Sequence, residues 1–164
     1  EVVVLPSGLA SHIAAIDTYD GPVDEAFAPM SVTIRLSDDI DVSRGDMICR
    51  VNNRPIVAQD VDAMVCWLSD AAELTPRTKL AIKHTTRSAR ALVNDLQYRL
   101  DINTLHRDES AERLALNEIG RVTMRVTQPL FIDEYRRNRV TGSFILMDEA
   151  TDTTVGAGML LAGS

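Results

Sequence analysis

The residues best suited to bind a metal or to act as nucleophiles are few in this sequence and lie far apart. Its histidines are His12, His84 and His106, and none has the H-x₃-H or HExxH spacing that places two imidazoles on one metal. His84 lies on the apolar face of an alternating run, which predicts a hydrogen-bonded core histidine. Cys49 and Cys66 lack C-x-x-C spacing and sit in apolar runs. They are predicted to be buried free thiols of a reducing compartment, with a disulfide between them as the alternative. We therefore expect no metal site and no catalytic residue.

The motifs of nucleotide chemistry are absent from the sequence. A P-loop, G-x-x-x-x-G-K-[ST], cradles phosphates with backbone amides, and neither it nor a guanine-reading N-K-x-D occurs. Gly142-Ser143-Phe144 lacks the flanks of a G-x-S-x-G nucleophile elbow. Gly156-Ala157-Gly158 is followed by no third glycine and no helix, which favours a strand with close backbone contacts over a dinucleotide fingerprint. No cofactor-binding residue is predicted.

Two charged stretches could meet a ligand or partner. Residues 37–41 (SDDID) lack the ligand order of a calcium loop, so a solvated loop is favoured over a divalent-cation site. Arg136, Arg137 and Arg139 form the densest basic stretch. They either belong to a solvated turn, neutralised in part by the two acids before it, or contact an anion or a partner. This stretch is the best surface candidate that the sequence offers.

Composition narrows the class of protein. The chain has 164 residues, 45% of them hydrophobic and 4% aromatic, so one or two small domains can bury a core of aliphatic side chains. Its net charge of −7 argues against broad binding to a phosphate backbone, which needs a basic face. No apolar run approaches the roughly 20 residues of a membrane span, and no signal-peptide pattern is present. We expect a cytoplasmic protein.

The dominant sequence period is two, which predicts antiparallel strands with one buried face. The clearest alternation covers residues 61–67, 80–84 and 122–126. Shorter strands are predicted at residues 2–5, 11–16, 31–36, 47–51, 142–147 and 154–161. Short strands at this spacing, separated by Gly and Pro turns, predict an all-β closed barrel or sandwich.

Two segments do not follow this period clearly. Residues 89–100 fit a helix, but the barrel context favours a strand with Leu92, Leu96, Tyr98 and Leu100 on one face, interrupted at Asn94. Residues 131–139 (FIDEYRRNR) are predicted to form a helical turn in a loop.

The charge is distributed unevenly along the chain. Residues 1–53 hold nine acids and three Arg, whereas residues 54–164 are nearly neutral. The change near Arg54-Pro55 predicts a domain boundary.

Several stretches resemble the large GTPase subunit of bacterial sulfate adenylyltransferase (ATP sulfurylase), a branch of the elongation-factor-Tu-like GTPases. The T-V-G-A-G stretch is similar to the last strand of the third domain throughout that superfamily. The stretches similar to the sulfurylase branch are Ser43–Ile48 (SRGDMI), Met64–Leu68, Lys83–Thr85, Tyr98–Asp101, Leu116–Arg121 (LNEIGR) and Asn138–Phe144 (NRVTGSF). The resemblance covers nearly the whole chain.

The resemblance implies a fold and a domain order. Residues 1–53 would be the later part of the second β-barrel domain, and residues 54–164 the complete third domain, an antiparallel Greek-key β-barrel of the translation-factor type. Since the chain lacks an initiator Met and opens in a predicted strand, we expect a fragment of a longer protein.

The resemblance also implies a function for the parent protein. In that family the small subunit makes adenylylsulfate from ATP and sulfate, for sulfate assimilation and cysteine biosynthesis, and GTP hydrolysis by the large subunit drives this nucleotidyltransferase. GTP and Mg would bind the GTPase domain, which precedes the two barrels. The expected partners of the fragment are its own GTPase domain, the small catalytic subunit and, in some relatives, a fused adenylylsulfate kinase domain. The fragment itself would be a non-catalytic scaffold. The alternative is a pair of RNA-binding barrels from a translation elongation factor.

Overall fold

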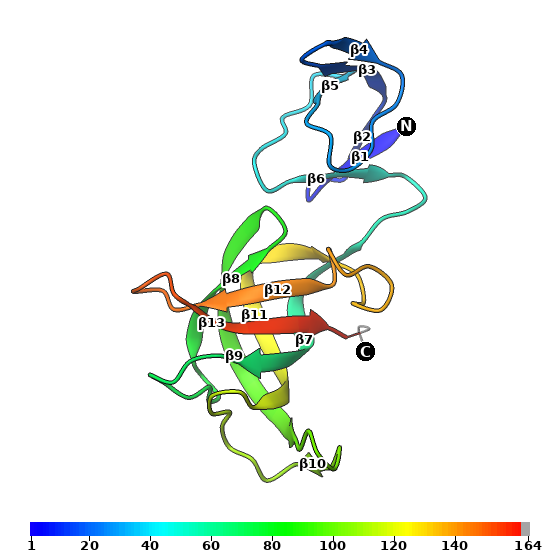
Figure 1. Cartoon of the computed structure of the whole chain (residues 1–164). Helices are drawn as coiled ribbons and strands as arrows, with labels where there is room; N and C mark the ends of the chain where they lie inside the picture. The colour runs from blue at the N-terminus through cyan, green and yellow to red at the C-terminus, as the bar shows by residue number, and fades with distance from the viewer. Residues whose placement is uncertain (162–164) are drawn as a thin grey trace. The chain divides into compact units, whose positions relative to one another are not determined.

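The chain is divided into two compact units, Glu1–Arg54 and Pro55–Ser164, in a computed structural model that describes residues 1–161. Every regular element in this described part is a β-strand (Figure 1). The all-β prediction is therefore confirmed.

The first unit holds six short strands in two separate three-stranded antiparallel sheets. One sheet has the order β2-β1-β6 and the other the order β4-β3-β5. The strands are β1 (Val2–Leu5), β2 (Leu9–Ser11), β3 (Ile13–Thr18), β4 (Gly21–Val23), β5 (Thr33–Leu36) and β6 (Met47–Arg50). Both sheets are open, so each keeps two edge strands whose outer backbone groups are not paired within a sheet.

The acidic stretch 37–41 is a loop after β5, as predicted. Its carboxylates are exposed. The Ser11 hydroxyl donates a hydrogen bond to Asp38 Oδ2 (2.7 Å), and the Asp38 amide donates one to Ser11 Oγ (3.3 Å). These bonds tie the loop to β2, so Asp38 has a structural role.

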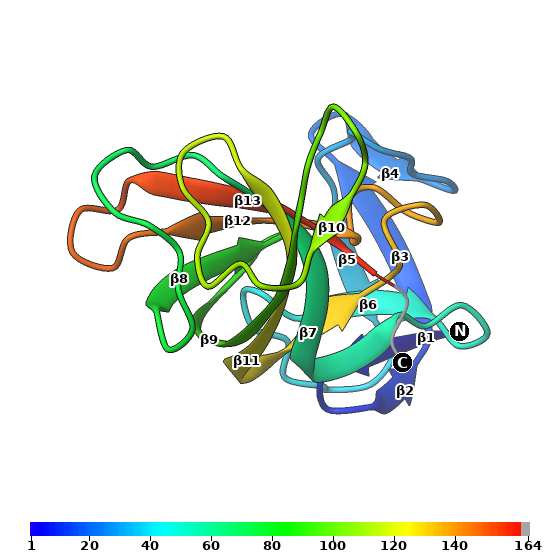
Figure 2. The ribbon, with the colours of Figure 1, turned by 90° about the horizontal axis from the view of Figure 1, so that it is seen from below.

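The second unit is a closed antiparallel barrel. Its strands are β7 (Ile56–Trp67), β8 (Lys79–His84), β9 (Arg87–Leu100), β10 (Arg107–Asp108), β11 (Ile119–Ile132), β12 (Ser143–Met147) and β13 (Thr154–Leu160). The order is β10-β9-β11-β7-β13-β12-β8, and pairing of β8 with β9 closes a ring of six strands, with β10 added at the end of β9. Figure 2 shows β8, β9, β11 and β7 side by side along one side of the barrel. Because β7 lies between β11 and β13 rather than beside β8, the connections are of the Greek-key type.

The inward side chains of the alternating runs form the barrel core, as the period of two predicts. Buried residues of these runs are Val61, Ala63, Val65, Trp67, Leu80, Ile82, His84, Val122, Met124 and Val126. Trp67 is the largest of them, and its Nε1 donates a hydrogen bond to the Ala72 carbonyl (2.6 Å). This hydrogen bond gives the indole N–H a partner, and without one the burial of this polar group would be costly.

The segment 89–100 is a strand, but its predicted inward face is partly wrong. The register of β9 against β11 slips twice, which leaves Asn94 and Gln97 without direct partners. Each slip moves the following side chains to the other face of the strand. As a result Val93 and Leu96 point into the core, whereas Leu92 is 39% exposed.

The predicted helical turn at 131–139 is also only partly correct. Phe131 and Ile132 end strand β11, paired with Val57 and Ile56. The turn begins after them, where the amides of Arg137 and Asn138 both donate to the Glu134 carbonyl (2.9 and 3.0 Å).

Candidate functional site

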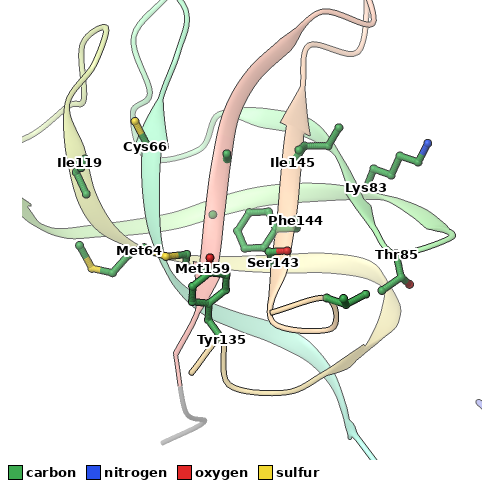
Figure 3. Close-up of a pocket in the computed structure, with 13 residues that line it drawn as sticks. Met64, Cys66, Lys83, Thr85, Ile119, Tyr135, Ser143, Phe144, Ile145 and Met159 are labelled. Atoms are coloured by element: carbon green, nitrogen blue, oxygen red, sulfur yellow. The ribbon is translucent and has the colours of Figure 1, made fainter. Parts of the chain in front are cut away.

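A groove with a volume of about 560 Å³ lies on the outer surface of the barrel. We call it the apolar groove. Figure 3 shows Cys66 and Met64 of β7 on one side of it and Ile145 of β12 with Lys83 of β8 on the other. Its lining residues are Met64, Cys66, Lys83, Thr85, Ile119, Tyr135, Val140, Ser143, Phe144, Ile145, Ala157, Gly158 and Met159.

The strand register explains why these side chains meet. Ile119 pairs with Cys66, Cys66 with Ala157, Ala157 with Ile145, and Ile145 with Lys83. Directly paired residues share a face of the sheet, with Cβ atoms about 5 Å apart. The result is one row across β11, β7, β13, β12 and β8, in which four members are uncharged and apolar. Such a row can bind the apolar part of another protein surface.

The loop of residues 133–142 forms one rim of the apolar groove and is held by several hydrogen bonds. Thr141 Oγ1 donates to Asp133 Oδ2 (2.7 Å), and the Tyr135 amide donates to the Leu160 carbonyl (3.1 Å). Asn138 Oδ1 accepts from the Val140 amide (3.0 Å). The loop therefore presents Tyr135 and Val140 to the groove in a fixed position.

Strand β13 brings its two glycines against the inside of the barrel, as the sequence predicted for the Gly156-Ala157-Gly158 stretch. An added Cβ at Gly158 would lie 2.6 Å from two ring carbons of Phe144. These glycines therefore allow side chains of the neighbouring strands to pack closely against β13.

The predicted surface residues Arg136, Arg137 and Arg139 all lie exposed on the rim loop. None of them is among the lining residues of the apolar groove. The Arg139 guanidinium lies over the Tyr135 ring, 6.0 Å from its centroid. Whether the three arginines contact an anion or a partner remains a prediction.

Both cysteines are free thiols, as predicted. The prediction that they are buried is only partly correct, because each is half-buried. Cys49 Sγ donates a weak hydrogen bond to the Val3 carbonyl (3.6 Å), and burial raises the pKa of this thiol. Cys66 lies in the apolar groove. Within residues 1–161, no group of three or more His, Cys, Asp or Glu side chains is placed to hold a metal ion.

His84 is a core histidine, as predicted. Its Nε2 lies 2.8 Å from the Thr141 carbonyl, which can only accept, so Nε2 carries the proton. Its Nδ1 is buried and has no hydrogen-bond partner among the described residues. Burial lowers the pKa of the imidazole, and the bond to Thr141 and the nearby Asp133 carboxylate offset this only in part.

We expect the stability of the barrel to fall on mild acidification because of His84. Its folded pKa is below its unfolded value of about 6.5, so the unfolded chain binds the proton first as the pH drops. The free energy of unfolding should decrease below about pH 6.5, by at most about 1.4 kcal/mol per pH unit. His84→Gln keeps a donor for Thr141 but cannot titrate. Urea denaturation between pH 5 and 7.5 should show a weaker pH dependence for this variant, and identical slopes would contradict the assignment.

The groove residues could not be recognised in the sequence because most of them are ordinary apolar side chains. The available signal was the second face of β7, where Met64, Cys66 and Leu68 occupy positions that a simple amphipathic strand would fill with polar residues. An apolar residue at an outward position indicates a second packing surface.

The fold and the sequence of the barrel together assign it to a known class, the GTP-eEF1A C-terminal domain-like domains. The solved structure of Sup35 complexed with GDP superimposes with a TM-score of 0.85, covering 98% of this chain and 40% of that chain at 18% identity. The chain belongs to the GTP-eEF1A C-terminal domain-like family, which matches residues 60–161.

Within this class, the chain is similar to proteins of sulfate metabolism. It is 58% identical over 161 residues to the bifunctional enzyme CysN/CysC of Mycobacterium tuberculosis, covering 98% of this chain and 26% of that protein. It is 42% identical to sulfate adenylyltransferase subunit 1 of Bacteroides fragilis, covering 98% and 33%. The predicted resemblance to that subunit is confirmed, and the chain spans about a quarter to a third of these relatives' length. In residues 1–161 no helix has the length and hydropathy of a membrane span.

Proposed function

We propose that this chain is the C-terminal β-barrel region of the GTPase subunit of a sulfate adenylyltransferase. The parent complex would make adenylylsulfate from ATP and sulfate in cytoplasmic sulfate assimilation. Residues 1–53 would be the later part of the second barrel domain and residues 54–164 the third. Similarity over 98% of the chain to a subunit of this name supports the assignment.

Within that complex the barrel acts as a non-catalytic docking module, and the apolar groove is the observation that carries this role. Its lining contains a single charged side chain, Lys83, among apolar and hydroxyl residues. Permanent protein interfaces have apolar, charge-depleted centres of this kind, whereas transient ones are more polar. The partner that we propose for the groove is the GTPase domain of the same chain, which would hold GTP and Mg, because a covalently linked domain is always available to it.

The small catalytic subunit would then contact the assembled GTPase subunit, and relatives such as CysN/CysC would add a kinase domain. The exposed Arg136, Arg137 and Arg139 are the candidate residues for a contact outside the apolar groove. Their place on a loop held by hydrogen bonds favours such a role, because binding would order little additional backbone.

A charge placed in the apolar groove should uncouple the barrel from its partner. Met159 is 42% exposed in the groove, and Leu116 is 46% exposed outside it, so the two residues form a matched pair. In the full-length subunit with its small subunit, Met159→Lys should lower GTP-stimulated adenylylsulfate formation about tenfold, because an ammonium would be desolvated in the interface. Leu116→Lys should change it less than about twofold.

Thermal unfolding of each variant, measured on the 164-residue chain, separates lost docking from lost folding. Equal activities of the Met159 and Leu116 variants would remove the groove from the proposal. The elongation-factor alternative makes a different prediction, since tight RNA binding that weakens steeply with salt would favour it.

A further inference from the structure

A second hollow on the barrel surface gathers three cations from three different strands. Its volume is about 610 Å³, and it shares no lining residue with the apolar groove. We call it the cationic hollow. Its lining includes Gln59, Lys79, Arg90, Leu92, Arg125 and Thr127.

The register of the three strands fixes the spacing of these groups. Lys79 of β8 and Arg125 of β11 both pair with Leu92 of β9, one from each side. Paired residues have Cβ atoms about 5 Å apart, so the two cations flank the exposed Leu92 on one face. Arg90 lies two residues from Leu92 in the same strand, before the first register slip, and therefore shares that face.

The cations of the hollow remain available to a ligand. Arg90 contacts Glu149 (3.2 Å), but the two side chains are 77% and 34% exposed. Arg125 contacts Asp60 (2.9 Å), with side chains 58% and 71% exposed. Exposed ion pairs contribute little stability, so either guanidinium can exchange its carboxylate for another at small cost. The side chain of Lys79 has no ion pair or hydrogen bond within residues 1–161.

We propose that the cationic hollow binds an acidic segment of a protein partner. Carboxylates of the segment pair with Lys79, Arg90 and Arg125, and an apolar side chain of the segment covers Leu92. Arg guanidinium groups bind carboxylates in a bidentate way, and the apolar centre between cations matches a segment in which acidic and apolar residues alternate. This surface is separate from the apolar groove, so the inference does not depend on which partner fills that groove.

A protein segment fits the hollow better than a nucleic acid does. No aromatic side chain lines it, so it offers no platform on which bases could stack. Glu149 lies on its rim, and the whole chain carries a net charge of −7, which opposes a polyanionic backbone extending beyond the hollow.

The test is a fluorescence titration of the 164-residue chain with a short labelled peptide in which Glu and Leu alternate, at low and physiological salt. We expect saturable binding. The double variant Lys79→Glu/Arg90→Glu should weaken it about tenfold or more, since two cations that attract the carboxylates of the peptide are replaced by carboxylates that repel them. Lys79→Gln, a milder change at a site with no ion pair, should weaken it in the same direction.

The control is Arg113→Glu, which reverses the charge of a single exposed arginine, paired with Glu73 (3.3 Å), outside the hollow. It should change the affinity less than about twofold. A peptide with Gln in place of Glu, and a single-stranded RNA of equal formal charge, complete the series. The proposal is overturned if the acidic peptide does not bind, if Arg113→Glu weakens binding as much as the double variant, or if the RNA binds more tightly through the same residues.

Discussion

A Gly142→Ala variant should lose about 3 kcal/mol or more of its free energy of unfolding. A Cβ atom at this position would meet the Tyr135 Cα and would lie 2.5 Å from the Asn138 carbonyl oxygen and 2.7 Å from the Tyr135 nitrogen. All three atoms belong to the backbone, so no side-chain rotation can relieve the overlap. The part of the rim loop that holds Tyr135 and Asn138 must move away from Gly142, which breaks hydrogen bonds that fix the loop.

The measurement is chemical denaturation of the 164-residue chain, compared at an unchanged m-value. Ser143→Ala is the matched control at the next residue, because it removes only the exposed hydrogen bond from Ser143 Oγ to the Arg139 carbonyl (2.7 Å). That loss should cost about 1 kcal/mol at most. If Gly142→Ala is no more destabilised than Ser143→Ala, the close contact between loop and strand does not exist in solution.

The same contact links the stability of the barrel to the shape of the apolar groove. Tyr135 and Val140 reach the groove only because the loop folds back over Gly142. The carbonyl group of Thr141, which follows Val140 in the loop, accepts the hydrogen bond from the buried His84. The loop is therefore anchored to the core from inside and to β13 through the Leu160 carbonyl, so the NRVTGSF stretch serves to position a rim of the groove.

The strands of the barrel could be predicted from the sequence because apolar residues alternate with polar ones along each strand and so mark its inward face. Val122, Met124 and Val126 alternate with polar residues, and burial follows that period. The interruption predicted at Asn94 is a bulge in the structure, but the register slips at Asn94 and Gln97 could not be predicted, since a slip depends on how β9 matches β11, a partner distant in sequence. The error at Leu92 follows directly: the slip at Asn94 lies between Leu92 and Leu96, so these two side chains point to opposite faces.

The surfaces show the same limit. Arg136, Arg137 and Arg139 were found because they are neighbours in sequence. The row through Cys66, Ala157 and Ile145 and the row through Lys79, Leu92 and Arg125 exist only once the strand order is known. Non-local pairing assembles both, so no local pattern could have revealed them.

The two glycines of β13, Gly156 and Gly158, flank the same residue, Ala157, but have different surroundings. At Gly158 an added Cβ would overlap the Phe144 ring, with two ring carbons at 2.6 Å. Phe144 is only 4% exposed, so its ring has no free space to enter. At Gly156 the nearest atoms are the Cys66 carbonyl oxygen and a Trp67 ring carbon, both at 3.3 Å, and small shifts can accommodate a methyl group.

Gly158→Ala should therefore lose about 2–3 kcal/mol of unfolding free energy, the cost of overpacking a filled core. Gly156→Ala should change by less than about 1 kcal/mol, because the reduced freedom of the unfolded chain offsets a mild contact. Denaturation curves of the two variants give the difference directly. Phe144→Leu in the Gly158→Ala background removes the ring carbons that overlap, so the double variant should lose less than the sum of the single losses. Equal losses at 156 and 158, or strict additivity with Phe144→Leu, would show that the ring does not lie against Gly158.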